Sequence, residues 1–182
     1  MTAPEASGAF AGVPDAFQRL WTPHRMAYIG GAAKPADSSP GACPFCRAPG
    51  LQDADGLVVH RGESAYVVLN LFPYNPGHVL VCPYRHVADY TDLTPDERAE
   101  FGEITRTAME VLRSVSRPAG FNIGMNQGEV AGAGIGAHLH QHVVPRWGGD
   151  SNFLPVIAQT RALPELLDES RRLIAEAWAA RA

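Results

Sequence analysis

Three histidines at alternate positions constrain the fold of this chain more than any other feature. They are His138, His140 and His142, in the run His-Leu-His-Gln-His-Val-Val. Alternate side chains of a β-strand point to the same face, with their origins about 7 Å apart. The spacing therefore predicts a strand from His138 to Val144 that carries three imidazole rings on one surface.

The clustering of these rings favours a functional surface. Titratable side chains gather in this way mainly at functional sites. A neutral imidazole is a nucleophile at pH 7, and neighbouring rings resist simultaneous protonation because like charges repel. The glycine-rich segment 127–137 precedes the histidines. It is either a flexible connection or a loop whose backbone N–H groups approach phosphate oxygens.

The remaining pattern predicts an α+β domain with an antiparallel β-sheet of about five strands and two main helices. Short apolar or β-branched runs predict the other strands, and a capping box with proline in the first turn marks the start of the longer helix. The expected strands are 57–60, 65–70, 78–84 and 121–126, and the expected helices are 94–116 and 163–180. This order of elements favours an antiparallel arrangement over alternating parallel units.

The chain divides into an N-terminal extension and one domain. Residues 1–42 are predicted to be an extension that is partly helical, around 15–29, and ends in a flexible linker. Residues 43–182 form the predicted domain. With 182 residues, of which 46% are hydrophobic and 19% charged, the chain is long enough to bury a substantial core.

Charge and hydropathy exclude several classes of partner. The net charge of -4 and the pI near 5.9 argue against nucleic acid or an anionic membrane as the main partner. A local site can still be positive, so a small phosphorylated ligand remains compatible. No apolar run approaches the roughly 18–20 residues that span a bilayer, and the start of the chain lacks the pattern of a secretory signal. We therefore expect a cytoplasmic protein.

Two of the three cysteines are separated by two residues, as Cys43-Pro44-Phe45-Cys46. In a reducing compartment this spacing indicates metal binding or redox chemistry and argues against a structural disulfide. The pair suits one tetrahedral zinc completed by two nitrogen ligands, and a reduced, metal-free pair is the alternative. Cys82, within an expected strand, is predicted to be packed core.

The histidine run and its surroundings resemble the histidine-triad family. The run matches the signature of alternating histidines and apolar residues, with Gln141 as a polar departure. The resemblance extends from about Cys43 to Phe153 and includes segments 70–97 and 142–153. The flanks beyond these segments resemble the branch that cleaves diadenosine tetraphosphate by phosphorolysis. The family resemblance implies an α+β fold and an enzyme that forms a nucleotidyl-histidine intermediate.

By this resemblance, His140 is the nucleophile that attacks the α-phosphate of a nucleotide. His142 would contact the phosphate oxygens and stabilise the developing charge. His78 would support the site from the neighbouring strand, and the alternative is an ordinary buried strand histidine.

The resemblance also assigns nucleotide-binding residues. Asn70 would hold the ribose hydroxyls, and the alternative is a turn-forming asparagine at a strand end. Asn126 would contact the phosphate side of the nucleotide, as would Gly134 in the glycine-rich loop.

A zinc site is implied by the same resemblance. Zinc-bearing members of the family complete the ligand set with one histidine after the ligand-binding strand and with the first histidine of the triad. The expected ligands are therefore Cys43, Cys46, His86 and His138. Four protein ligands leave no open coordination position, so the zinc would be structural and would orient the strand that carries His140. The resemblance further implies a homodimer.

The acceptor of the nucleotidyl group stays open. Water would give hydrolysis of a dinucleoside polyphosphate, and inorganic phosphate would give phosphorolysis. The short phosphorylases of the family carry a glycine-serine pair where this chain has Ala133-Gly134, which lacks the hydroxyl. The uridylyltransferase-like branch is disfavoured because it replaces the third histidine with glutamine, whereas this chain has His142. A nucleotide-binding sensor or interaction module with incidental turnover is the alternative function.

Overall fold

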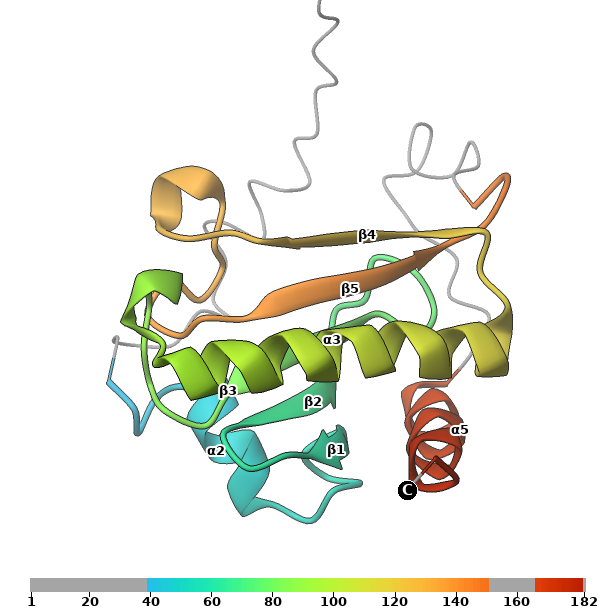
Figure 1. Ribbon diagram of the computed structural model, residues 1–182, viewed down its shortest axis with the longest axis horizontal. Coiled ribbons are helices and arrows are strands. Elements are labelled where there is room, and N and C mark those ends of the chain that lie inside the picture. The colour runs from blue at the N-terminus through green and yellow to red at the C-terminus, as the bar shows by residue number, and fades with distance from the viewer. Residues whose placement is uncertain (1–38, 151–165, 182) are drawn as a thin grey trace, which may run out of the picture.

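The computed structural model describes residues 39–150 and 166–181, which contain one antiparallel sheet and the helices that pack on it (Figure 1). The sheet has five strands in the order β1-β2-β3-β5-β4, and every neighbouring pair is antiparallel. The strands are β1 (Val58–Arg61), β2 (Ala65–Leu69), β3 (Val79–Pro83), β4 (Gly120–Met125) and β5 (Gln141–Arg146). The predicted α+β fold with an antiparallel sheet is confirmed.

The two main helices are α3 (Pro95–Ser116) and α5 (Leu167–Ala179). α3 begins with the predicted capping box, in which Thr94 and Glu97 exchange side-chain and backbone hydrogen bonds. A third and very short helix, α2 (Pro44–Arg47), was not predicted. The short 3₁₀ helices are Ala48–Gly50, Tyr90–Asp92 and Glu129–Ala131. Within the described ranges, none of the helices is both long and apolar enough to span a membrane.

The two faces of the sheet have different partners because successive side chains of a strand alternate between them. One face packs on α3 and α5, which Figure 1 shows across the sheet and beside β1. Its core residues include Val67, Val79, Val81, Val143, Phe101, Val111, Leu112 and Ile174. The other face carries a smaller apolar cluster that packs against α2 and its surroundings: Val58, Tyr66, Val68, Leu80 and Cys82. The triad histidines lie on this second side.

Most predicted boundaries agree with the structure to within one residue, and β5 and α5 need a larger correction. β5 begins at Gln141 and not at His138, because the segment before it hydrogen-bonds to a loop: Leu139 N–H donates to the carbonyl of Val87 at 2.6 Å. α5 begins at Leu167, four residues after the predicted start, and residues 163–165 lie outside the described residues. The predicted helix at 15–29 and most of the predicted linker also lie outside them.

Gln141, the polar residue inside the triad, points to the helix-covered face. Its Nε2 donates to Thr105 Oγ1 at 2.9 Å, and the Thr105 hydroxyl donates to the carbonyl of Phe101 at 2.8 Å. Both side chains are buried. The departure from the apolar pattern is therefore explained by a partner on α3, which ties β5 to that helix between the two histidines.

Replacing Thr105 with valine should destabilise the protein by about 1–3 kcal/mol, because a shape-conserving change leaves the buried amide of Gln141 without an acceptor. Adding Gln141→Leu should recover most of that loss, since both partners are then apolar. Chemical denaturation of the two single variants and the double variant measures the coupling. Strictly additive losses would contradict the pairing.

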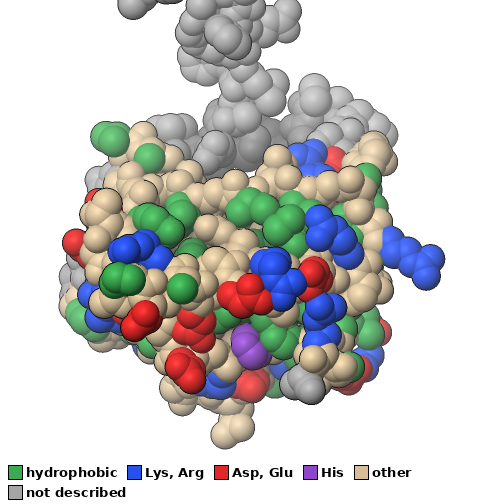
Figure 2. All heavy atoms as spheres, viewed as in Figure 1, with side chains coloured by type: hydrophobic (Ala, Val, Ile, Leu, Met, Phe, Trp, Pro, Cys, Tyr) green, Lys and Arg blue, Asp and Glu red, His purple; other side chains and the backbone are tan. Residues whose placement is uncertain are grey.

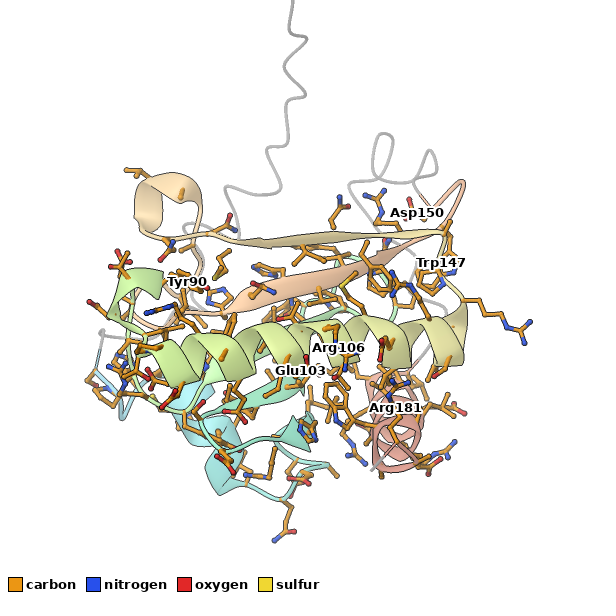
Figure 3. All side chains as sticks on the ribbon, in the orientation of Figure 1. Tyr90, Glu103, Arg106, Trp147, Asp150 and Arg181 are labelled. Carbon is orange, nitrogen blue, oxygen red and sulfur yellow. The ribbon has the colours of Figure 1, made fainter. Side chains whose placement is uncertain are left out.

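The outer surface of α3 is charged and solvent-exposed (Figure 2). Arg106 bridges Glu103 and Glu110 there, and Arg181 at the end of α5 also pairs with Glu110 (Figure 3). Exposed ion pairs of this kind contribute little to stability.

Candidate functional site

Four histidine rings and one phenylalanine ring form a row on the face opposite α3. The ring centroids of His140 and His142 are 5.1 Å apart, and those of His142 and His78 are also 5.1 Å apart. At the other end, the ring of Phe45 lies between His138 and His140, with centroid distances of 5.6 and 4.8 Å. The strand register contributes to this row. His142 pairs with Leu80 across β5 and β3, and His78 lies two residues before Leu80, so its side chain points to the same face.

The ring of His140 is held so that one nitrogen keeps its lone pair. Its Nδ1 donates to the backbone carbonyl of His138 at 2.8 Å, which leaves Nε2 unprotonated in the neutral ring. Burial lowers the pKa of His140 below its ordinary value, so the neutral form dominates at pH 7. His140 therefore presents a nucleophilic nitrogen without a separate general base.

The hydrogen bonds of His78 set the orientation of His142. Tyr74 N–H donates to His78 Nδ1 at 3.1 Å, so the proton of that ring is on Nε2. This Nε2–H donates to His142 Nδ1 at 2.9 Å, which places the proton of His142 on Nε2 as a donor. Burial, with a smaller contribution from His140, lowers the pKa of His142 to about 4. Although His78 is fully buried, it is bonded into the row rather than only packed.

A largely apolar cavity of about 380 Å³ opens beside His140 and His142. Its walls come from α2 and the turn after it, from the segment before β1, from β2 with the loop that follows it, from β3 and from the glycine-rich loop. The residues are Pro44, Phe45, Ala48, Gly56, Leu57, Val68, Leu69, Asn70, Leu71, Phe72, Leu80, Gly134 and Ile135. Two predicted nucleotide-binding residues, Asn70 and Gly134, thus lie in one cavity with the two histidines. Asn70 also acts as a turn former, since its Oδ1 accepts from Phe72 N–H at 3.0 Å, and its Nδ2 lies 3.2 Å from His78 Nδ1.

Asn126 lies on a second cavity, of about 450 Å³, which shares His142 with the first. Arg146 also lines it, and the Arg146 guanidinium is held by Asp150 just beyond β5, where Figure 3 labels Asp150 and Trp147. Trp147 Nε1 donates to Ser116 O at 3.1 Å and so fixes this end of β5 to the end of α3. The structure therefore places Asn126 across His142 from Asn70 and Gly134.

The four predicted metal ligands converge on one point. The ligand atoms of Cys43, Cys46, His86 and His138 all lie within 4.8 Å of one another. The Sγ atoms of Cys43 and Cys46 are each 3.4 Å from His138 Nδ1, and Cys46 Sγ is 3.1 Å from His86 Nδ1. Sulfur and nitrogen ligands of a tetrahedral zinc are separated by about 3.5 Å, so this set fits the ion.

The surroundings of the cluster also suit a cation. His138 Nε2 donates to the carbonyl of Pro83 at 2.9 Å, which turns the unprotonated Nδ1 toward the two sulfurs. Burial and the neighbouring Cys43 raise the pKa of Cys46 to about 11. A divalent cation between the sulfurs would lower the free energy of both thiolates and so favour deprotonation of the two cysteines.

Sequence reasoning did not identify Phe45 or the apolar cavity wall. The sequence pattern around the cavity wall predicted strands, but it does not distinguish a packed face from a cavity. This applies to Leu57, Val68 and Leu80. Phe45 carried a signal that was missed: it lies between two cysteines, so any metal bound by those cysteines holds its backbone close by.

The sequence and fold place the chain in a known family. Residues 52–149 match the model of the HIT domain, and the chain belongs to the HIT, or histidine-triad, family.

The relatives include enzymes and a zinc protein. The chain is 51% identical over 171 residues, 92% of this chain and 88% of the relative, to the AP-4-A phosphorylase of Mycobacterium tuberculosis. Over 93 residues, 51% of this chain and 50% of the relative, it is 37% identical to the asymmetrical bis(5'-nucleosyl)-tetraphosphatase of Schizosaccharomyces pombe. Among solved structures, it superimposes with a TM-score of 0.63 and 30% identity on a Zn-bound histidine-triad family protein from Mycobacterium smegmatis, covering 79% of this chain and 97% of that one.

Proposed function

We propose that this protein cleaves dinucleoside polyphosphates such as diadenosine tetraphosphate through a nucleotidyl-His140 intermediate. The main observation in support is the unprotonated Nε2 of His140 at the edge of a nucleoside-sized apolar cavity. The 51% identity to a phosphorylase over 92% of the chain supports the same substrate class.

In this proposal the apolar cavity holds the nucleoside. The base contacts the aliphatic walls, and Asn70 binds the ribose hydroxyls, for which its place beside His78 is suited. Gly134 and Asn126 flank the phosphates on the two sides of His142. The adenine nucleotide is therefore bound chiefly by burial of its base and is oriented by a few polar contacts.

The reaction has two displacements at the α-phosphorus. His140 Nε2 forms a bond to the α-phosphorus while the bond from that phosphorus to the bridging oxygen breaks. The electron pair of the broken bond stays on the oxygen of the departing polyphosphate. His142 Nε2–H donates to a phosphate oxygen and stabilises the charge that develops there. An acceptor oxygen then attacks phosphorus, the P–N bond breaks, and neutral His140 is restored.

Inorganic phosphate is the acceptor that we favour, on the strength of the similarity to the phosphorylase. With diadenosine tetraphosphate and phosphate, the expected products are ADP and ATP. In phosphate-free buffer, turnover should fall to a slow formation of AMP and ATP. Chromatography of the two reactions measures this difference. AMP and ATP at the same rate under both conditions would identify water as the acceptor, and no product under either would favour a nucleotide-binding sensor.

The proposal includes a zinc ion held by Cys43, Cys46, His86 and His138. Its chemistry there would be structural, since four protein ligands complete a tetrahedral shell. These residues would hold α2 and the start of the triad against β3. We also propose a homodimer, for which β4, an outer strand of the sheet in the described residues, is one candidate edge, and a mass near twice 19.5 kDa in light scattering would support it.

A further inference from the structure

Helix α2 belongs to two sites at once. Cys46 lies within the helix and Cys43 directly precedes it, so both of its ends are tied to the metal cluster. Pro44 and Phe45, in the same turn, line the nucleoside cavity together with Ala48. One short peptide thus supplies half of the predicted metal ligands and a wall of the predicted nucleotide site.

Phe45 is the side chain that contacts both the metal cluster and the nucleoside cavity. Its ring contacts His138, a predicted metal ligand, and His140, the predicted nucleophile, with centroid distances of 5.6 and 4.8 Å. The Phe45 carbonyl accepts a hydrogen bond from the hydroxyl of Tyr66 at 2.7 Å. Since Tyr66 is fully buried in β2, this bond anchors the backbone between the two cysteines to the sheet.

The helix has few other anchors: Phe45 and Ala48 pack on the apolar cluster of the sheet, and Arg61 donates to the carbonyls of Pro49 and Leu51 just after it. It is four residues long, none of them is buried, and its N-cap makes no side-chain hydrogen bond. A single turn is not stable by itself in water. Its place against the cavity therefore depends on Cys43 and Cys46 together with the Tyr66 bond and this packing, and release of the cysteines would remove the restraint that holds Phe45 between the two histidines.

We propose that Phe45 is a nucleotide-binding and positioning residue through which occupancy of the metal site and occupancy of the nucleoside cavity stabilise each other. This inference rests on the proposed function and adds a linkage to it. Coupling between two binding sites is reciprocal, so if the bound metal holds the cavity wall in place, a nucleotide against that wall must hold the metal. Zinc is then required for nucleotide affinity as well as for stability.

The test is the rate at which zinc leaves the zinc-loaded full-length protein and enters a chromogenic chelator, with and without saturating AMP. AMP binding is measured by calorimetry on the same samples. We expect AMP to slow zinc release and, in equilibrium competition with the same chelator, to raise the affinity for zinc by about 5- to 150-fold, the usual range of coupling between two sites. In Phe45→Ala the effect of AMP on zinc release should be lost and the Kd for AMP should rise. Phe45→Leu, which keeps apolar volume at the wall, should restore part of both.

Leu71→Ala is the matched control. Leu71 lines the same cavity from the loop after β2 and is well exposed. Its truncation should weaken AMP binding, yet saturating AMP should slow zinc release as in the unmodified protein.

Three results would decide against the proposal in distinguishable ways. AMP that binds but leaves zinc release unchanged would refute the coupling and leave the proposed function intact. Full coupling in a folded, zinc-loaded Phe45→Ala protein would refute the role of Phe45. Failure of the unmodified, zinc-loaded protein to bind AMP would overturn the proposed function and this linkage together.

Discussion

Replacing His140 with asparagine is expected to abolish turnover of diadenosine tetraphosphate while nucleotide binding persists. The amide of asparagine can still donate to the backbone carbonyl of His138, but it has no nitrogen lone pair that can bond to phosphorus. Apart from residue 140 itself, the walls of the apolar cavity are unchanged, so the Kd for AMP should stay within a few-fold. Losses on removal of a nucleophile commonly exceed about 10⁴-fold in kcat.

The measurement combines steady-state rates with calorimetry of AMP binding. His60→Asn is the matched control, because His60 stacks on Trp178 at a centroid distance of 4.4 Å, at the α5 side of the sheet. That variant should keep near-normal turnover. If the His140 variant also turned over at a near-normal rate, the assignment of the nucleophile would be wrong.

Cys43→Ser should release the zinc and cause a large loss of stability. A serine hydroxyl is a poor replacement for a thiolate ligand, and Cys43 is only 2% exposed, so solvent cannot compensate. Structural zinc sites supply apparent binding free energies of about 10–16 kcal/mol, and each kcal/mol of stability corresponds to about 2–4 °C in a protein of this size. We expect the melting temperature to fall by more than about 10 °C.

Elemental analysis and thermal unfolding check this expectation. Cys82→Ser is the control, since Cys82 is equally buried but packs in the apolar cluster of β3. It should lower the melting temperature and keep about one zinc per chain. A metal-free preparation of the unmodified protein, purified without chelators, would remove the zinc proposal.

Much of the site followed from local spacing. The alternation of His138, His140 and His142 predicted rings on a common side, and the Cys-x-x-Cys pair predicted a metal site. The family resemblance, and not the spacing, implied the two histidines that the structure brings to that pair. The capping box predicted the start of α3 to the residue. In each case the determining interaction lies within a few residues of sequence, or depends on ligand chemistry that only a few residue types provide.

The parts that sequence reasoning missed depend on contacts between distant segments. The start of β5 is set by the bond from Leu139 to Val87, and the direction of Gln141 by a threonine on α3. The separation of Asn126 from Asn70 follows from sheet order, because β3 and β5 lie between the strands that these two residues adjoin. The periodicity of a single segment cannot predict such contacts between distant segments or the order of strands in a sheet.

His138 makes two separate contacts. Its ring nitrogen faces the cysteine sulfurs, and its backbone carbonyl accepts the hydrogen bond from His140. Every amino acid has that oxygen, whereas only a few side chains can coordinate zinc. The orientation of His140 Nε2, the proposed nucleophile, is thus insensitive to which residue occupies position 138. A descendant chain could lose the two cysteines and the first histidine and still keep the hydrogen bond that directs the second.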